Sequence, residues 1–382
     1  MAAKHKKNCV VVTWLGEEQP GFLDFSYRIQ SLAASYQLTV ISTFVFTQPE
    51  LMHADAEYLV INIKNGRTAW LAYLWRCASL IRQQKPDVVV LLHSMAAPVA
   101  MMISNIPSLC YWNEHPTHIA PEPDNFSPIK ATTRSAIRWL MYQGARSATL
   151  VMPIGEAHRD DLIAHACKAQ KMQMMYMGVA EAFSGVALTT ADIDLNAAIK
   201  LIYVGSVQQD RGRDVMLEAM AIVNRQHKIA HLNIVGASDE QYQYCQTALQ
   251  QLKAIDSVTI HHRVAGNKIP SFMQQADAGL CLWQDLPWYR FNPPTKLFEY
   301  LVAGLPVLAS NIRTHTAYIE EGVNGFIFDY NSQSLAQAIQ KLWQRRAQLP
   351  QIKNRTVESS NAYLWQNIEP TFLSAVEKAA LR

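Results

Sequence analysis

Short apolar runs that alternate with helical segments constrain the fold of this chain more than any other feature. Six runs in each half are expected to form strands: Val10–Leu15, Leu38–Phe44, Tyr58–Ile63, Asp87–Leu92, Ser108–Trp112 and Thr149–Ile154, and then Lys200–Val207, His231–Val235, Val258–His262, Gly279–Trp283, Pro306–Ser310 and Gly325–Phe328. Uninterrupted Val, Ile and Leu runs are typical of strands buried on both faces of a parallel sheet. The pattern therefore predicts an α/β protein.

Segments with helical periodicity separate these runs, for example Phe22–Tyr36, Ala69–Gln83 and Ala131–Arg146. Two successive sets of strands and helices predict two Rossmann-like domains. A chain of 382 residues is long enough to give each domain a buried core.

The domain boundary is expected in Ser184–Ala198, a small, polar and acidic segment between the apolar ends of the two halves. This places the first domain at residues 1–184 and the second at 185–359. Residues from about 360 to 382 are expected to form a C-terminal helix, which either packs back on the first domain or closes the second.

The composition excludes several classes of protein. An apolar content of 49% with 17% charged residues indicates a globular chain. The whole chain has a net charge of +3, and residues 1–195 carry 16 basic and 16 acidic side chains. Such a small positive charge argues against a nucleic-acid partner. We read the basic start and its short apolar run as a first strand, not a signal peptide, and expect no membrane span. The six cysteines lie far apart without metal-ligand spacing, which favours reduced thiols in the cytoplasm.

The segment Asn292–Ser310, NPPTKLFEYLVAGLPVLAS, predicts an anion site. Its two prolines favour an irregular approach to a helix that begins near Thr295 and ends at Gly304. The first turn of such a helix has unpaired N–H groups and a positive dipole end, where the charge of Lys296 is unfavourable unless an anion joins it. Glu299, one turn further on, can accept a hydrogen bond from a hydroxyl of the same ligand. The alternative is an amphipathic helix on which both side chains are merely solvated.

A second candidate phosphate site lies in LIYVGSVQQDRGRD, where a strand ends at Gly205 and a helix starts near Asp214. Ligands of doubly wound sheets bind beyond the carboxyl ends of strands. Gly205 permits a close approach of the backbone, and Arg211 and Arg213 supply charge and donors for phosphate.

Both segments resemble signatures of the retaining GT-B glycosyltransferases, especially family 4. Asn292–Ser310 is similar to the PxKLFEYLxAGLPVxAS form of the donor-binding signature, and Gly205–Gly212 to the GR(x)nKG element, with Ser206 in place of the usual Arg and Arg211 in place of Lys. The resemblance implies a GT-B fold, in which two Rossmann-like domains face each other across a cleft. It places a nucleotide-sugar donor in the second domain and the acceptor in the first. The donor-binding residues that it implies are Gly21, Gly205, Ser206, Arg211, Arg213, Arg263, Val264, Thr295, Lys296 and Glu299.

Two of these assignments rest on neighbouring elements of the family pattern. Arg263 and Val264 stand where backbone groups flank the nucleobase, although a surface turn is an equal alternative. Gly21 matches the second glycine of a GG turn whose first glycine is replaced by Pro20, and a tight turn explains it without any ligand.

The family carries two glutamates eight positions apart, and this chain keeps only the second. Glu299 matches it, whereas Phe291 occupies the position of the first and cannot accept a hydrogen bond. Either the donor sugar is recognised differently, for example as a deoxy sugar with an apolar face, or Asp285 or Asn292 substitutes. The third explanation is that the chain has lost activity.

The segment PSLCYWNEHPTHIAP predicts the chemistry in the first domain. A strand ends near Trp112 and is followed by Glu114, His115 and His118. The family carries a histidine that faces the sugar at this position, so the resemblance makes His115 the catalytic candidate, with Glu114 and His118 as the next choices. A solvated polar loop is the alternative, and the spacing does not indicate a metal site.

The resemblance implies sugar transfer with retention, by front-face attack in which the leaving phosphate helps to deprotonate the acceptor. No metal or other cofactor is then expected. The products would be polysaccharide, lipopolysaccharide or another glycoconjugate. Two alternatives stay open: a catalytically silent subunit that binds sugar nucleotides, and a GT-B sugar-nucleotide epimerase.

A basic helical face gives the last expectation. Lys130, Arg134 and Arg138 repeat every four residues within Ser127–Ser147, a segment that contains no acid. The face predicts either peripheral contact with a membrane that carries a lipid-linked acceptor, or an ordinary solvated surface. A cytoplasmic protein, at the inner face of the membrane in the first case, is expected.

Overall fold

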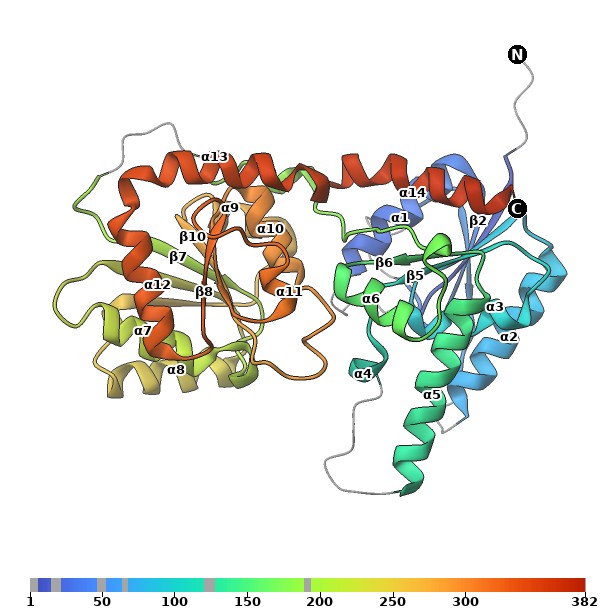
Figure 1. The fold of residues 1–382 in the computed structure, drawn as a ribbon, viewed down its shortest axis with the longest axis horizontal. Coiled ribbons are helices and arrows are strands. Elements are labelled where there is room, and N and C mark those ends of the chain that lie inside the picture. Colours follow the sequence, from blue (N-terminus) through green and yellow to red (C-terminus); the bar gives the residue numbers. More distant parts are fainter. Residues whose placement is uncertain are drawn as a thin grey trace, which may run out of the picture. The chain divides into compact units, whose positions relative to one another are not determined.

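Two parallel sheets of six strands form the protein. The computed structural model describes residues 6–14, 22–46, 53–63, 68–119, 128–188 and 194–381. The chain divides into two compact units, one of residues 1–178 with 365–382 and the other of residues 179–364 (Figure 1). The predicted α/β class is confirmed, and all twelve expected strands are present within a few residues of their predicted limits.

The sheet of the first unit has the order β3-β2-β1-β4-β5-β6. Its strands are β1 (Asn8–Val12), β2 (Gln37–Ser42), β3 (Ala56–Val60), β4 (Val88–Leu91), β5 (Ser108–Trp112) and β6 (Leu150–Pro153). Its helices are α1 (Phe22–Ser35), α2 (Ala69–Gln84), α3 (Val99–Met102), α4 (Pro116–Ile119), α5 (Pro128–Ser147), α6 (Glu156–Ala164) and α14 (Trp365–Ala380). Every residue of β4 and β5 is buried, as expected for central strands covered on both faces.

The C-terminal helix α14 packs against α1 and the sheet of the first unit. A hydrogen bond from the Ser31 hydroxyl to Glu369 joins the two helices, and Phe372 of α14 is fully buried. The chain passes between the units twice, at 178/179 and 364/365. Beside these passages, Val179 N donates to Tyr363 O at 2.9 Å. The described residues of the expected boundary segment, 184–188 and 194–198, lie in the second unit.

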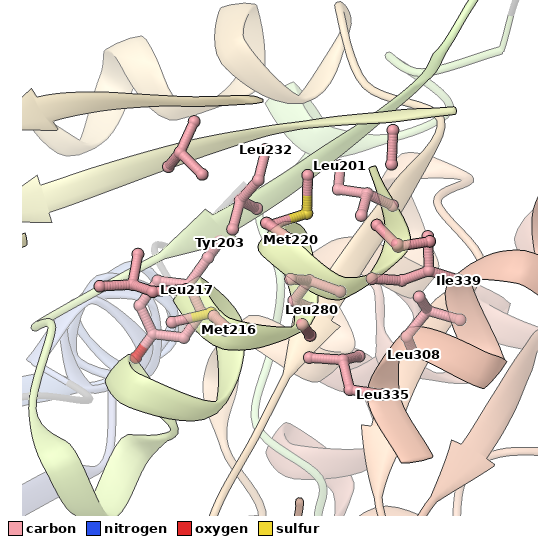
Figure 2. Packing of buried hydrophobic residues seen from close by; sticks show 14 of the residues in the cluster. Leu201, Tyr203, Met216, Leu217, Met220, Leu232, Leu280, Leu308, Leu335 and Ile339 are labelled. Atoms are coloured by element: carbon pink, nitrogen blue, oxygen red, sulfur yellow. The ribbon is translucent and has the colours of Figure 1, made fainter. Parts of the chain in front are cut away.

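The sheet of the second unit has the order β12-β11-β10-β7-β8-β9. Its strands are β7 (Ile199–Val204), β8 (Ala230–Ala237), β9 (Val258–His262), β10 (Ala278–Cys281), β11 (Val307–Ser310) and β12 (Gly325–Phe328). Its helices are α7 (Arg213–Val223), α8 (Asp239–Gln251), α9 (Ile269–Met273), α10 (Thr295–Ala303), α11 (Arg313–Thr316), α12 (Ser332–Gln344) and α13 (Leu349–Ser360). One apolar cluster joins β7, β8 and β10 to α7 and α12 (Figure 2).

The two sheets share one topology. When the strands of each sheet are numbered from its own earliest strand, both sheets have the same order, 3-2-1-4-5-6. This is the Rossmann order, in which the chain changes its direction of progress across the sheet next to the earliest strand. The reversal lies between β1 and β4 in the first unit and between β7 and β10 in the second. Ligands of such sheets bind at the carboxyl ends of these strand pairs, so these two positions are where a site is expected.

Candidate functional site

The carboxyl end of β7 forms a turn that needs glycine. Gly205 has a φ of +125°, and a Cβ there would lie 3.1 Å from the Lys296 Nζ atom. Gly236, at the end of the neighbouring strand β8, has a φ of +119°, and its Cβ would lie 2.8 Å from Gly205 O. Both positions therefore exclude side chains, which leaves the turn open to an approaching ligand.

Lys296 lies in the first turn of α10 and its side chain is buried. Its Nζ atom has no hydrogen-bond partner among the described residues and lies 3.8 Å from the centroid of the Tyr203 ring. Burial, together with the charge of Arg211, lowers the pKa of Lys296 to about 8, although Cys281 and Glu299 oppose the shift. An anion bound beside Nζ would restore the pKa and supply the missing partner.

Arg211 brings a second cation to the same turn. Its Nη1 atom donates to the Ser206 hydroxyl at 3.0 Å, while its Nε atom is buried without a hydrogen-bond partner in the described structure. Burial disfavours the charge, but hydrogen bonding with Tyr289 and the nearby Tyr203 and Asp210 raise the pKa of Arg211. The structure therefore brings Gly205, Ser206, Arg211 and Lys296 together, as the sequence predicts, and leaves a donor unused on each cation.

Glu299 follows one turn after Lys296 and is half-buried. Burial raises the pKa of its carboxyl to about 7, and the charge of Lys296 partly opposes the shift. Thr295, the first residue of α10, is exposed, and Pro294 before it supplies no side-chain cap to the helix. The start of α10 is thus a helix N-terminus with a buried cation and a carboxyl one turn away.

In the first unit, His115 is buried and held by partners at both ring nitrogens. Nδ1 lies 2.7 Å from the Thr117 hydroxyl, and Nε2 lies 3.1 Å from Asp161 and 3.3 Å from the Tyr142 hydroxyl. Burial opposes ionisation of Asp161, yet His115 and Tyr142 together hold its pKa below the ordinary value. Glu114 and His118 are more exposed and pair with each other at 2.5 Å. Gly21 lies outside the described residues.

Comparison with known families decides what the two units are. Residues 11–178 match the glycosyl transferase 4-like domain, and residues 198–345 match the glycosyl transferases group 1. Together the matches span most of the chain. The chain belongs to the group 1 glycosyltransferases.

Two named relatives share part of the chain. Spore coat protein SA of Bacillus subtilis (strain 168) is 27% identical over 200 residues, which are 49% of this chain and 51% of that protein. The amylovoran biosynthesis glycosyltransferase AmsK of Erwinia amylovora is 26% identical over 205 residues, which are 52% of this chain and 48% of that protein. The match therefore spans about half the length of each relative.

Solved structures of similar proteins establish the GT-B fold. Anabaena Alr3699/HepE in complex with UDP superimposes with a TM-score of 0.73 at 15% identity, covering 97% of this chain and 100% of that one. WaaG, a glycosyltransferase involved in lipopolysaccharide biosynthesis, gives a TM-score of 0.70 at 16% identity, with coverage of 97% and 98%. Both likenesses extend over both domains, which confirms the expected two-domain α/β architecture.

Not every predicted donor residue of this glycosyltransferase lies at the Gly205 turn. Arg213 is bound to Asp214 at 2.8 Å and lies over the Tyr244 ring at 3.5 Å, so its guanidinium already has two neighbours. Arg263 and Val264 follow β9, and β8 separates that strand from β7. Arg263 is exposed and Val264 half-buried.

The position of the missing family glutamate lies in the loop between β10 and α10. Phe291 and Asn292 are half-buried there. Asp285, a candidate substitute for the glutamate, is exposed, and Arg290 donates to its carboxylate at 2.7 and 3.1 Å. An Asp285 that replaced the glutamate would have to give up this pair.

Two residues at the strand reversals, His93 and Tyr203, are not among those that the sequence predicts for the site. His93 lies two residues beyond the end of β4, is buried, accepts a hydrogen bond from Met95 N at 3.1 Å, and has its pKa lowered to about 4 by burial. The available signal was a polar residue immediately after the expected strand Asp87–Leu92. Tyr203, beneath Lys296, gave no signal, since an aromatic residue in a strand usually belongs to the core.

The described residues contain neither a metal-binding cluster nor a helix that could span a membrane. No group of three or more His, Cys, Asp or Glu side chains in the described ranges is arranged to hold a metal ion. Within the same ranges, every helix is too short or too polar to traverse a lipid bilayer.

Proposed function

We propose that this group 1 glycosyltransferase moves a sugar from a nucleoside diphosphate sugar to a glycan or lipid-linked acceptor, with retention of the anomeric configuration. The product would belong to a polysaccharide, lipopolysaccharide or other glycoconjugate. The observation that carries the proposal is the buried Lys296 ammonium, which lies over the Gly205 turn without a hydrogen-bond partner among the described residues.

An unpaired buried ammonium is costly, so its presence calls for a ligand of opposite charge. Arg211 presents a second unused donor at the same turn, and the first turn of α10 adds its dipole. A diphosphate matches two cations and a helix N-terminus better than a single carboxylate does. The same groups stabilise the negative charge that develops on the leaving diphosphate during transfer.

Glu299 supports a nucleotide over an inorganic anion. Its carboxyl lies one helical turn beyond Lys296, where it can accept hydrogen bonds from ribose hydroxyls while the phosphates occupy the turn. Arg263 and Val264 are proposed to flank the nucleobase. Similar proteins favour UDP as the first nucleotide to test, because HepE has been crystallised with UDP and with UDP-glucose.

The acceptor is proposed to bind in the first domain. His115, with Glu114 and His118 beside it, is the candidate for contact with the sugar. In this proposal the leaving phosphate helps to deprotonate the acceptor hydroxyl, and no metal ion takes part. If no metal ion takes part, the protein should be as active with a chelator as it is in a reaction supplemented with magnesium.

Product analysis separates this function from its alternatives. A thermal-shift and calorimetric screen of UDP, GDP and ADP identifies the base first, and the matching sugar nucleotides are then incubated with candidate acceptors. Transfer to an acceptor supports the proposal, an epimerised sugar nucleotide indicates an epimerase, and binding without turnover indicates a silent subunit. A protein that binds none of the nucleotides contradicts the proposal.

We further propose that α5 brings the enzyme to the cytoplasmic face of a membrane carrying its acceptor. None of the residues of α5 before Met141 is buried, and in this part Ile129 is 77% and Trp139 57% exposed. Lys130, Arg134 and Arg138 add charge to a helix without acids. Basic residues near an anionic surface contribute about 1 kcal/mol each.

Pelleting with vesicles of zwitterionic lipid, with and without anionic phosphatidylglycerol, tests the surface. Replacing Lys130, Arg134 and Arg138 together by Ala should weaken binding to anionic vesicles by up to about 100-fold. The matched control replaces three exposed basic residues elsewhere, Arg225, Lys228 and Lys378, and should leave binding unchanged. Pelleting that does not depend on anionic lipid would remove the membrane proposal and leave the transferase proposal standing.

A further inference from the structure

Two buried tyrosines connect β7 and α10: one belongs to β7 and contacts α10, and the other belongs to α10 and contacts β7. Tyr203, in β7, lies beneath the ammonium of Lys296 in α10. Tyr300, in α10, accepts a hydrogen bond at 2.8 Å from Val204 N in β7. Neither side chain is exposed. The two contacts cross between the same two elements, which are the elements that carry the Gly205 turn and Lys296.

Tyr203 supports both sides of the phosphate site with different atoms. Its hydroxyl donates to Ser206 O at 2.9 Å, which holds the turn after Gly205, while its ring faces the Lys296 Nζ atom at 3.8 Å from the centroid. Elsewhere the ring belongs to the apolar cluster with Met216 and Leu217 of α7 (Figure 2). An aromatic face attracts a cation without neutralising it, so the ammonium keeps its capacity to bind an anion.

Tyr300 continues the sheet where β10 stops pairing with β7. Gly205 N donates to Val235 O of β8, so the preceding amide, Val204 N, points to the other side, toward β10. The pairing of β7 with β10 ends at Ile202, and the Tyr300 hydroxyl accepts the next hydrogen bond in its place. The ring reaches this position over Gly279, where a Cβ would lie 2.4 Å from it.

We propose that Tyr203 and Tyr300 are positioning residues of the donor site, which fix the Gly205–Ser206 turn and the Lys296 ammonium at one spacing before the diphosphate arrives. The inference rests on the proposed function and deepens it. In a preformed site, little binding free energy is lost in ordering the turn and the lysine side chain when the ligand binds. The same charges are already in place to stabilise the leaving diphosphate during transfer.

Tyr203 offers a test that separates its two roles. Tyr203→Phe keeps the ring and removes only the bond to Ser206 O, so UDP binding should weaken by about threefold to fivefold. Tyr203→Leu removes the ring as well, and UDP binding should weaken by about 10- to 30-fold at pH 7. Tyr300→Phe, which leaves Val204 N without its acceptor, should resemble Tyr203→Phe.

The pH dependence distinguishes positioning from a general loss of stability. Burial has already lowered the pKa of Lys296 to about 8, and loss of the ring removes a group that favours the charged ammonium. In Tyr203→Leu the affinity for UDP should therefore begin to fall at a lower pH than in the wild type. Leu232→Ala, in the same apolar cluster, is the matched control: it should lower Tm but move neither the affinity nor its pH profile.

A double-mutant cycle with Lys296→Met completes the test. Without the ammonium, Tyr203→Leu and Tyr203→Phe should bind UDP equally. If the wild-type protein binds UDP, and Tyr203→Phe and Tyr203→Leu both bind it with the affinity and pH profile of the wild type, the positioning role alone is overturned. A wild-type protein that binds no nucleoside diphosphate overturns the proposed function and this inference together.

Discussion

The two sheets have the same strand order, but the strand reversals of the two units are built from different chemistry. In the second unit, two cations lie at the carboxyl end of β7, and each keeps a buried donor without a hydrogen-bond partner among the described residues. In the first unit, His93, after β4, accepts a backbone hydrogen bond, and His115, after β5, has partners at both nitrogens. The unused donors support the proposed anion site in the second unit, whereas the histidines of the first unit are held in place by their hydrogen-bond partners. The same strand order therefore carries unpaired cationic donors in one unit and hydrogen-bonded histidines in the other.

Lys296→Met should have the largest effect. Loss of a charge-assisted contact to phosphate costs about 1.5–3 kcal/mol, so UDP should bind about 10- to 150-fold more weakly in calorimetry. The variant should also be more stable than the wild type at neutral pH. The folded pKa of about 8 lies below the ordinary 10.5, so the unfolded chain binds this proton more tightly. The side chain therefore lowers stability by its full amount below about pH 8, and this cost disappears as the pH rises through 10.5. Equal UDP affinity in the two proteins would remove Lys296 from the site.

Arg211→Ala should follow, with UDP binding about tenfold weaker because one charged donor is lost. Arg213→Ala is its matched control, only two positions away. Its guanidinium is already bound to Asp214, so UDP affinity should change by less than about twofold. Equal losses in the two variants would contradict the assignment of Arg211, and not Arg213, to the phosphate site.

Glu299→Ala should act on the ribose and not on the phosphates. A carboxylate that accepts hydrogen bonds from ribose makes UDP bind better than 2′-deoxy-UDP by about tenfold. The variant should lose this preference, measured as the ratio of the two dissociation constants at pH 8, where the Glu299 carboxyl, with a pKa of about 7, is ionised. A preference that survives the substitution would place the ribose elsewhere.

His115→Ala should have the smallest effect on the donor. It leaves Asp161 with fewer buried hydrogen-bond partners, so Tm should fall, while the UDP dissociation constant should stay within about twofold of the wild type. The Asp161 contribution to stability is present above its unfolded pKa, near 3.8, and is lost as the pH falls through its lower folded pKa. A large loss of UDP affinity would show that the two reversals do not act separately.

The sequence predicts the fold well because its strands are continuous apolar runs, and such runs have few alternatives. It also locates the proposed donor residues Gly205, Arg211, Lys296 and Glu299 beside one another, since each lies in a short contiguous segment at the end of a strand or the start of a helix. These segments come together because parallel strands end at the same edge of the sheet.

The remaining contacts depend on residues that are far apart in the chain. Nothing around Tyr203 reveals that Lys296, more than ninety positions later, will lie above its ring. Likewise, Asp161 becomes the partner of His115 only when α6 packs beside the loop after β5. The sequence gives no reason to distinguish Arg213 from Arg211. In the structure, Gly212, with a φ of +84°, turns the chain between them, so that Arg213 pairs with Asp214 while Arg211 bonds to Ser206.

Calorimetry of UDP binding at pH 8 measures whether the Gly205 turn and Lys296 bind a diphosphate. In the free protein Lys296 is about half protonated at this pH, and the bound diphosphate should raise its pKa. Titrations in two buffers of different ionisation enthalpy should therefore show an uptake of about half a proton for each UDP bound, and none in Lys296→Met. UDP binding without proton uptake, or with equal uptake in Lys296→Met, would show that Lys296 does not bind the diphosphate.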